Sequence, residues 1–177
     1  MIEPFNATES EVRQTAYFLS GLLSIVSFQT CVAFAEGFKP YDLREIEQKV
    51  AQVFGNDFRV SIKAKTINAD DVRGQTIKLL IDRQNADVGQ RDRSDAAYFQ
   101  QLEEACNQQG LPCEIDELSL GSIVGRMTTI RLTGGRVSVN ITFLNDGDRL
   151  TIRSASNTKA IAQKNAEIAL GVVSDKL

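Results

Sequence analysis

The stretch "MTTIRLTGGRVSVNITFLNDGDRLTIRSA", residues 127–155, decides the fold. Apolar and polar residues alternate along three segments of it, which is the pattern of half-buried β-strands. The pairs Gly134-Gly135 and Asp146-Gly147 separate these segments, and both pairs suit two-residue hairpin turns. The stretch therefore predicts a three-stranded antiparallel meander.

The two turns also predict how the strands pair. Folding the chain on both of them brings apolar side chains opposite each other on one face of the meander. The predicted inward pairs are Leu132 with Val137, Ile130 with Val139, Phe143 with Leu150 and Ile141 with Ile152. Because turn chemistry and alternation agree, one register is favoured over its neighbours.

Periodic patterns predict the remaining elements outward from the meander. The predicted elements are helices at 42–54, 95–109 and 157–177, strands at 58–65 and 76–82, an edge strand at 111–120, and polar loops at 66–75 and 83–94. This order predicts an α+β fold in a single domain, residues 1–177. Its antiparallel β-sheet has about five to six strands, with helices packed on one face.

The N-terminal region predicts a long apolar helix over residues 8–36, ahead of an α/β body over 41–177. No charged residue occurs between Ala16 and Ala35. Small residues recur at helical spacing along this segment and would let another helix approach closely. They include Ser20, Ser24, Ser27 and Cys31. The serines favour burial in a core or a dimer interface over insertion of residues 16–35 in a membrane.

The cysteines and the N-terminus predict a cytoplasmic protein. Cys31, Cys106 and Cys113 are an odd number without CxxC spacing, and we expect small core residues in a reduced, intracellular chain. The opening "MIEPFNATESEV" carries three glutamates and no basic residue before Arg13, unlike the positive start of a signal peptide. We therefore expect an uncleaved chain, with association to a membrane through residues 16–35 as the alternative.

Histidine is absent from the 177 residues, and this narrows the possible chemistry. Without imidazole the chain cannot form a Ser-His-Asp or Cys-His nucleophile, a histidine base or a histidine-ligated metal site. Adjacent carboxylates such as Asp116-Glu117 point in different directions and do not form an acid–base pair. The sequence predicts a protein that is not an enzyme and needs no cofactor and no metal.

The net charge of −3 gives no overall reason to expect nucleic acid as a partner, but the charge is uneven along the chain. Residues 94–121 contain six acids and no Lys or Arg, whereas residues 125–154 contain five arginines. In the predicted register the polar face of the meander carries Arg131, Asn140 and Arg153. Arg59, Lys63, Lys65 and Lys78 join it if the earlier strands are in phase.

Two functions are consistent with these patterns. The first is a non-enzymatic interaction protein, an adaptor or chaperone-like protein that holds a protein partner and self-associates through its apolar helices. Its predicted partner-binding residues are Ser20, Ser24, Ser27 and Cys31. The alternative is nucleic-acid binding through the basic sheet face and the start of the last helix. The predicted contacts are then Arg131, Asn140, Arg153, Lys159 and Lys164.

Overall fold

The computed structural model describes residues 37–82, 94–108 and 112–177, which form helices and strands in an α+β arrangement. The elements in chain order are α1 Leu43–Phe54, β1 Phe58–Lys63, β2 Thr66–Asp71, β3 Thr76–Asp82, α2 Asp95–Gln108, β4 Cys113–Leu120, β5 Ile123–Arg131, β6 Val137–Asn145, β7 Asp148–Ser156 and α3 Lys159–Val173. Within these residues no helix is both long and apolar enough to span a membrane. The predicted helix over 8–36 lies outside the described residues.

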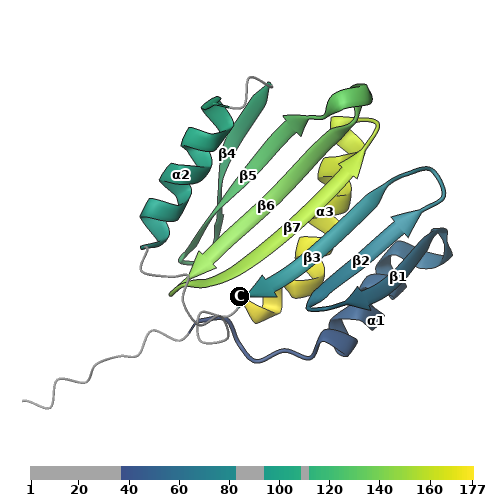
Figure 1. The fold of residues 1–177 in the computed structure, drawn as a ribbon. Coiled ribbons are helices and arrows are strands. Elements are labelled where there is room, and N and C mark those ends of the chain that lie inside the picture. The colour runs from purple at the N-terminus through teal and green to yellow at the C-terminus, as the bar shows by residue number, and fades with distance from the viewer. Residues whose placement is uncertain (1–36, 83–93, 109–111) are drawn as a thin grey trace, which may run out of the picture. The chain divides into compact units, whose positions relative to one another are not determined.

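All described strands join one antiparallel sheet in the order β1-β2-β3-β7-β6-β5-β4 (Figure 1). The antiparallel α+β prediction is confirmed, but the sheet has seven strands, whereas five to six were predicted. The additional strand is β2, "TINADD", which the sequence indicated as a polar loop. Only Ile67 and Ala69 of this strand are buried, so its alternation is too short and too polar to stand out.

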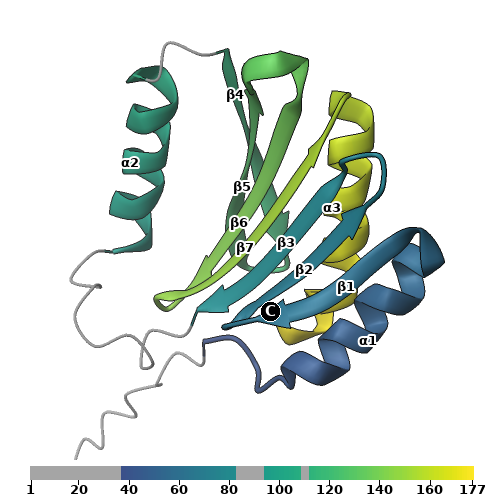
Figure 2. The ribbon, with the colours of Figure 1, turned by 45° about the vertical axis from the view of Figure 1, so that its right-hand side comes forward.

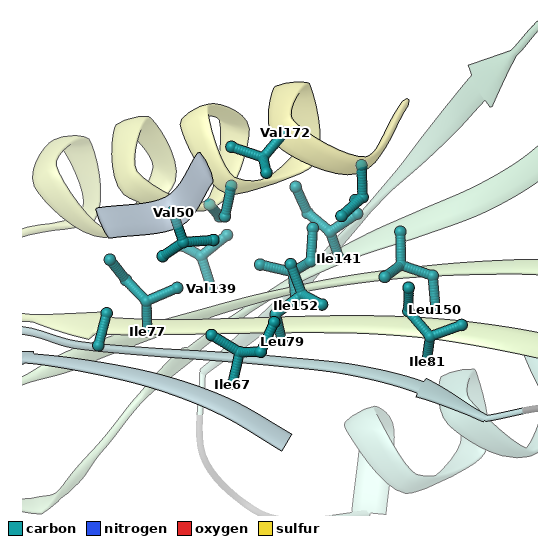
Figure 3. Packing of buried hydrophobic residues seen from close by; sticks show 14 of the residues in the cluster. Val50, Ile67, Ile77, Leu79, Ile81, Val139, Ile141, Leu150, Ile152 and Val172 are labelled. Carbon is teal, nitrogen blue, oxygen red and sulfur yellow. The ribbon is translucent and has the colours of Figure 1, made fainter. Parts of the chain in front are cut away.

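Helices α1 and α3 cover one face of the sheet, and the hydrophobic core lies beneath them (Figure 3). Ile141 and Ile152 pair across β6 and β7 at the centre of this core, where each side chain is at most 1% exposed. Three alanines of α3, Ala162, Ala166 and Ala169, are fully buried, so the helix lies close to the strands. The covered face is called the core face below.

Helix α1 begins and ends where its sequence indicates. Asp42 caps the first turn by accepting a hydrogen bond of 2.8 Å from the backbone N–H of Arg44. Gly55 follows the last turn with a φ of 67°, a left-handed conformation that glycine adopts without steric cost. The helix buries Ile46 and Val50 against the sheet, as its periodicity predicted.

The pairing of the meander is correct for one hairpin and wrong by one residue for the other. Phe143 lies opposite Leu150 as predicted, whereas Val139 lies opposite Thr129 and not opposite Ile130. The first turn is longer than two residues, because residues 133–135 form a three-residue turn closed by a hydrogen bond from the Leu132 N–H to the Arg136 carbonyl at 2.8 Å.

The shift of one residue exchanges the two faces of β5. Thr129 and Arg131 move to the core face, and Arg126 and Ile130 move to the opposite face, which is called the open face below. Arg131 therefore does not share a face with Arg153, as the sequence had predicted. This correction separates residues that the nucleic-acid hypothesis had grouped together.

Helix α2 lies on the open face, opposite α1 and α3 (Figure 2). It contacts Arg126 and Arg149, which alternate along their strands with the buried Met127 and Leu150. The prediction that all helices pack on one face is therefore wrong for α2. Its hydrophobic periodicity indicated a helix, but periodicity carries no information about which side of a sheet the helix covers.

Candidate functional site

A cavity of about 540 Å³ lies between α2 and the neighbouring ends of β5 and β6. We call it the α2 cleft. Its apolar lining comes from Phe99 on α2, Val124 on β5 and Leu144 on β6. Phe99 and Leu144 are each 7% exposed, whereas Val124 is 51% exposed. The polar residues in the lining are Asp95, Gln100, Glu103, Ser122, Arg126, Asn145 and Asp146.

Arg126 joins α2 to the sheet at this cleft. Its guanidinium lies 5.0 Å from the centre of the Phe99 ring, a cation–π distance. It also forms ion pairs with Glu117 on β4 at 3.0 Å and with Glu103 on α2 at 3.4 Å. The positive charge of Arg126 is therefore shared between two carboxylates of the protein itself.

A second contact holds the N-terminal half of α2 on the same face. Arg149 pairs with Asp82 on β3, and its guanidinium lies 5.6 Å from the centre of the Tyr98 ring. Burial favours the neutral form of Arg149, but its hydrogen bonds to Asp82 and to the Tyr98 hydroxyl outweigh this and raise its pKa. Arg149 thus stays charged and links β3, β7 and α2.

A disulfide holds the C-terminal half of α2. It joins Cys106 on α2 to Cys113 at the start of β4, with 5.6 Å between the two Cα atoms. The sequence had indicated separate core residues for these two cysteines, and the pairing corrects that expectation. The α2 cleft therefore has one wall that is covalently attached to the edge strand of the sheet.

A smaller cavity of about 280 Å³ lies at the start of α3, and we call it the α3 pocket. Arg131 and Lys159 both line it, together with Glu114 of β4. Lys159 pairs with Glu114 and, through this hydrogen bond and its charge, lowers the pKa of the carboxyl, with a smaller contribution from Arg131. The hydroxyl of Thr129, also in the lining, is buried without a hydrogen-bond partner among the described residues.

The open face carries most of the basic strand residues that were predicted to share it, whereas Lys65 lies in the turn between β1 and β2. Lys78 on β3 lies directly opposite Arg153 on β7, and Arg59 and Lys63 of β1 lie on the same face. Arg153 donates a hydrogen bond of 2.9 Å to the side-chain oxygen of Asn140. Within the described ranges neither Lys78 nor Arg153 forms an ion pair, so two positive charges face each other across neighbouring strands.

The predicted site residues thus fall into separate places. Asn140 and Arg153 lie together on the open face, Arg131 and Lys159 lie together at the α3 pocket, and Lys164 is exposed on α3. The predicted partner-binding residues lie outside the described residues; they are Ser20, Ser24, Ser27 and Cys31. Whether any of these residues binds a partner stays a prediction.

The α2 cleft was missed in the sequence because its residues come from three distant segments. Phe99 and Arg126 meet only after α2 has crossed to the open face. One signal was visible, since the acidic stretch over 94–121 includes α2, which contributes Asp95 and Glu103 to the cleft lining. Among the described residues, no group of His, Cys, Asp or Glu side chains is arranged to hold a metal ion.

Comparison with known proteins assigns no family to this chain. No protein-family model matches the sequence, and no curated protein matches it. A function therefore has to rest on the α2 cleft, the α3 pocket and the charges around them.

Proposed function

We propose that this protein is a non-enzymatic binding protein whose α2 cleft holds an apolar, positively charged segment of a partner protein. The observation that carries the proposal is the cleft itself, in which aromatic and aliphatic side chains lie among seven polar ones in a volume of about 540 Å³. Ligand sites of proteins combine apolar walls with polar groups and typically have a volume of about 300–1,000 Å³.

The apolar lining supports anchoring by one or two side chains of the partner. Phe99 provides a rigid aromatic wall, and Leu144 closes the sheet side. Val124 is half exposed, so an entering side chain would remove its apolar surface from water, which favours binding.

The charge of the lining supports a basic partner. Asp95, Glu103 and Asp146 line the cleft, and Arg126 is the one positive side chain among the described lining residues. Arg126 is already paired with Glu103 and Glu117, so it contributes little attraction for an acidic ligand. A segment that carries Lys or Arg beside its apolar residues would complement this lining.

The same arrangement supports binding without catalysis. The carboxylates of Glu103 and Glu117 are each engaged in an ion pair with Arg126, which gives both of them a structural contact in the protein. The chain also lacks histidine, the side chain most often used for proton transfer.

Fluorescence anisotropy with three labelled hexapeptides would test this proposal. The first alternates Leu and Lys, the second replaces Lys by Glu, and the third replaces Leu by Ser. We expect the Leu-Lys peptide to bind best, because it alone matches both the apolar lining and the negative charge. Equal affinity for all three peptides would refute the assignment of the cleft.

Two variants make the test specific to the site. Val124→Lys adds a positive charge at the cleft, and Val72→Lys adds the same charge at the turn between β2 and β3, where Val72 is 99% exposed. We expect Val124→Lys to weaken binding of the Leu-Lys peptide by about tenfold, which is about 1.4 kcal/mol. Val72→Lys should leave the affinity unchanged. If both variants behave alike, the peptide binds elsewhere.

Nucleic-acid binding is the second candidate, and the facing pair Lys78 and Arg153 favours it. Two like charges opposite each other destabilise a sheet slightly, and a phosphate between them would relieve this repulsion. Anisotropy with labelled RNA and DNA at two salt concentrations tests it, with Arg153→Glu as the variant and Lys49→Glu on α1 as the charge-matched control. Loss of binding in the first variant alone would support this candidate.

A further inference from the structure

We propose that the segment from Arg13 to Ala35 is an export signal and that the chain is cleaved after Ala35, so that the exported protein begins at Glu36. The segment has the three parts that export signals share: a basic residue, an uncharged apolar stretch, and a small-x-small sequence before the cleaved bond. The basic residue is Arg13, and the final part is Ala33-Phe34-Ala35.

The length of the apolar stretch fits a signal better than a membrane span. Apolar residues dominate from Ala16 to Phe28, which is about 13 residues and within the usual 7–15 of a signal. Gln29 and Thr30 then interrupt the stretch before the cleavage sequence. A membrane-spanning helix needs about 20 predominantly apolar residues, and the serines within this stretch weaken that reading further.

The disulfide is the structural observation that points to export. Cys106 and Cys113 are bonded, and Cys106 is 6% exposed, so the bond belongs to the packed junction of α2 and β4. Disulfides of this kind form and persist in oxidising compartments and are rare in the cytosol. The expectation of a cytoplasmic protein rested on unpaired cysteines and on the composition of the N-terminus, and the bond removes the first of these arguments.

The number of cysteines supports the same cleavage site. The chain has three cysteines, and two of them pair with each other. Cleavage after Ala35 removes the third, Cys31, and leaves an even number with both thiols bonded. An exported protein that kept Cys31 would carry a free thiol able to form intermolecular disulfides.

The core begins just after the proposed cleavage site. Phe38 is 2% exposed, and its backbone N–H donates a hydrogen bond of 3.0 Å to the carboxylate of Asp148. Gly37 packs so closely against Asp148 that a Cβ there would lie 2.5 Å from its Oδ2 atom. Cleavage between Ala35 and Glu36 therefore leaves this junction and the described core intact.

This proposal competes with the predicted self-association through residues 8–36, because the exported protein would lack them. The proposed signal begins at Arg13, after the three glutamates near the start of the chain that are untypical of an export signal. It is independent of what the α2 cleft binds.

Expression of the full chain in a Gram-negative bacterial host tests the proposal. Periplasmic and cytosolic fractions are separated, and intact mass and N-terminal sequence are measured. Free thiols are alkylated with iodoacetamide before and after reduction. We expect a periplasmic protein that begins at Glu36 and that takes up no label before reduction and two labels after it.

Two variants define the cleavage site. The double variant Ala33→Gln with Ala35→Gln removes both small residues and should accumulate as the uncleaved precursor. Phe34→Gln changes the intervening residue, which the motif leaves open, and should be cleaved like the wild type. A cytosolic chain that begins at Met1 and has three alkylatable thiols without reduction would overturn the proposal. A full-length, membrane-bound chain would overturn it as well.

Discussion

Replacing Arg126 by alanine should weaken the attachment of the N-terminal half of α2 to the sheet, where Arg149 still contacts Tyr98, without unfolding the sheet. The side chain of Arg126 is only 14% exposed and contacts α2 through the Phe99 ring and Glu103. The cation–π contact contributes about 1 kcal/mol at such a site. The carboxylates of Glu103 and Glu117 are 47% and 82% exposed, so each ion pair contributes only about 0.5 kcal/mol. Glu117 lies on β4, so only the contacts with Phe99 and Glu103 hold α2, and the loss for α2 is about 1.5 kcal/mol.

Native-state hydrogen exchange measures this loss directly. A loss of about 1.5 kcal/mol raises the population of the open state by about tenfold, so amides of residues 95–102 should exchange faster by that factor. The disulfide at Cys106 still holds the other end of α2, so the effect should decrease along the helix. Arg153→Ala is the control, because Arg153 bonds to Asn140 and not to α2. Unchanged exchange over residues 95–102 would refute the role of Arg126.

Three further changes test the packing by chemical unfolding. Gly125→Ala should destabilise the protein by about 1–3 kcal/mol, because the new Cβ would lie 2.6 Å from the Phe143 ring; an unchanged midpoint would contradict this close approach. Ile152→Ala at the fully buried centre of the sheet should cost about 2–5 kcal/mol, and a smaller loss would mean that the core collapses around the gap. Replacing Cys106 and Cys113 together by serine should lower the free energy of unfolding by about 2–3 kcal/mol, because the short loop between them is no longer closed in the unfolded chain. A wild-type protein that is equally stable with and without reductant would contradict this.

Elements with local signals were predictable from the sequence. Helix α1 has a capping aspartate and a terminating glycine, and both are confirmed; of its predicted apolar stripe Ile46 and Val50 are buried, whereas Val53 is 50% exposed. The hairpin of β6 and β7 turns at Asp146-Gly147, where both residues have the positive φ that such a turn requires. Its register follows from this turn and from the apolar pairs.

The hairpin of β5 and β6 shows where local signals are insufficient. Gly134 and Gly135 both have positive φ, as a two-residue turn would need, but Thr133 joins them in a three-residue turn. Two glycines permit either loop length, and the alternatives differ by one residue in register. The structure selects the pairing in which Ile130 lies opposite Ser138 on the open face, a choice that the two glycines alone do not specify.

The site depended even more on long-range contacts. Whether α2 covers the core face or the open face depends on Arg126, Arg149 and the bond between Cys106 and Cys113, none of which is encoded in the helix's own periodicity. Once α2 is placed, the cleft follows from the side chains that face it. The acidic composition of residues 94–121 therefore indicated a concentration of carboxylates in this part of the chain, but not where they lie in the fold.

The placement of charge on the open face relates the two candidate functions to each other. The sheet order puts β7, with Arg153, two strands away from β5, with Arg126 and the cleft. A basic peptide in the α2 cleft is attracted by Glu103 and Asp146 but repelled by Arg153 and Lys78, whereas a nucleic acid experiences the reverse. Arg153→Glu should therefore strengthen binding of the Leu-Lys peptide and weaken binding of RNA or DNA. A variant that weakens both ligands would show that they share one site, and the division of this face into an acidic and a basic part would then be wrong.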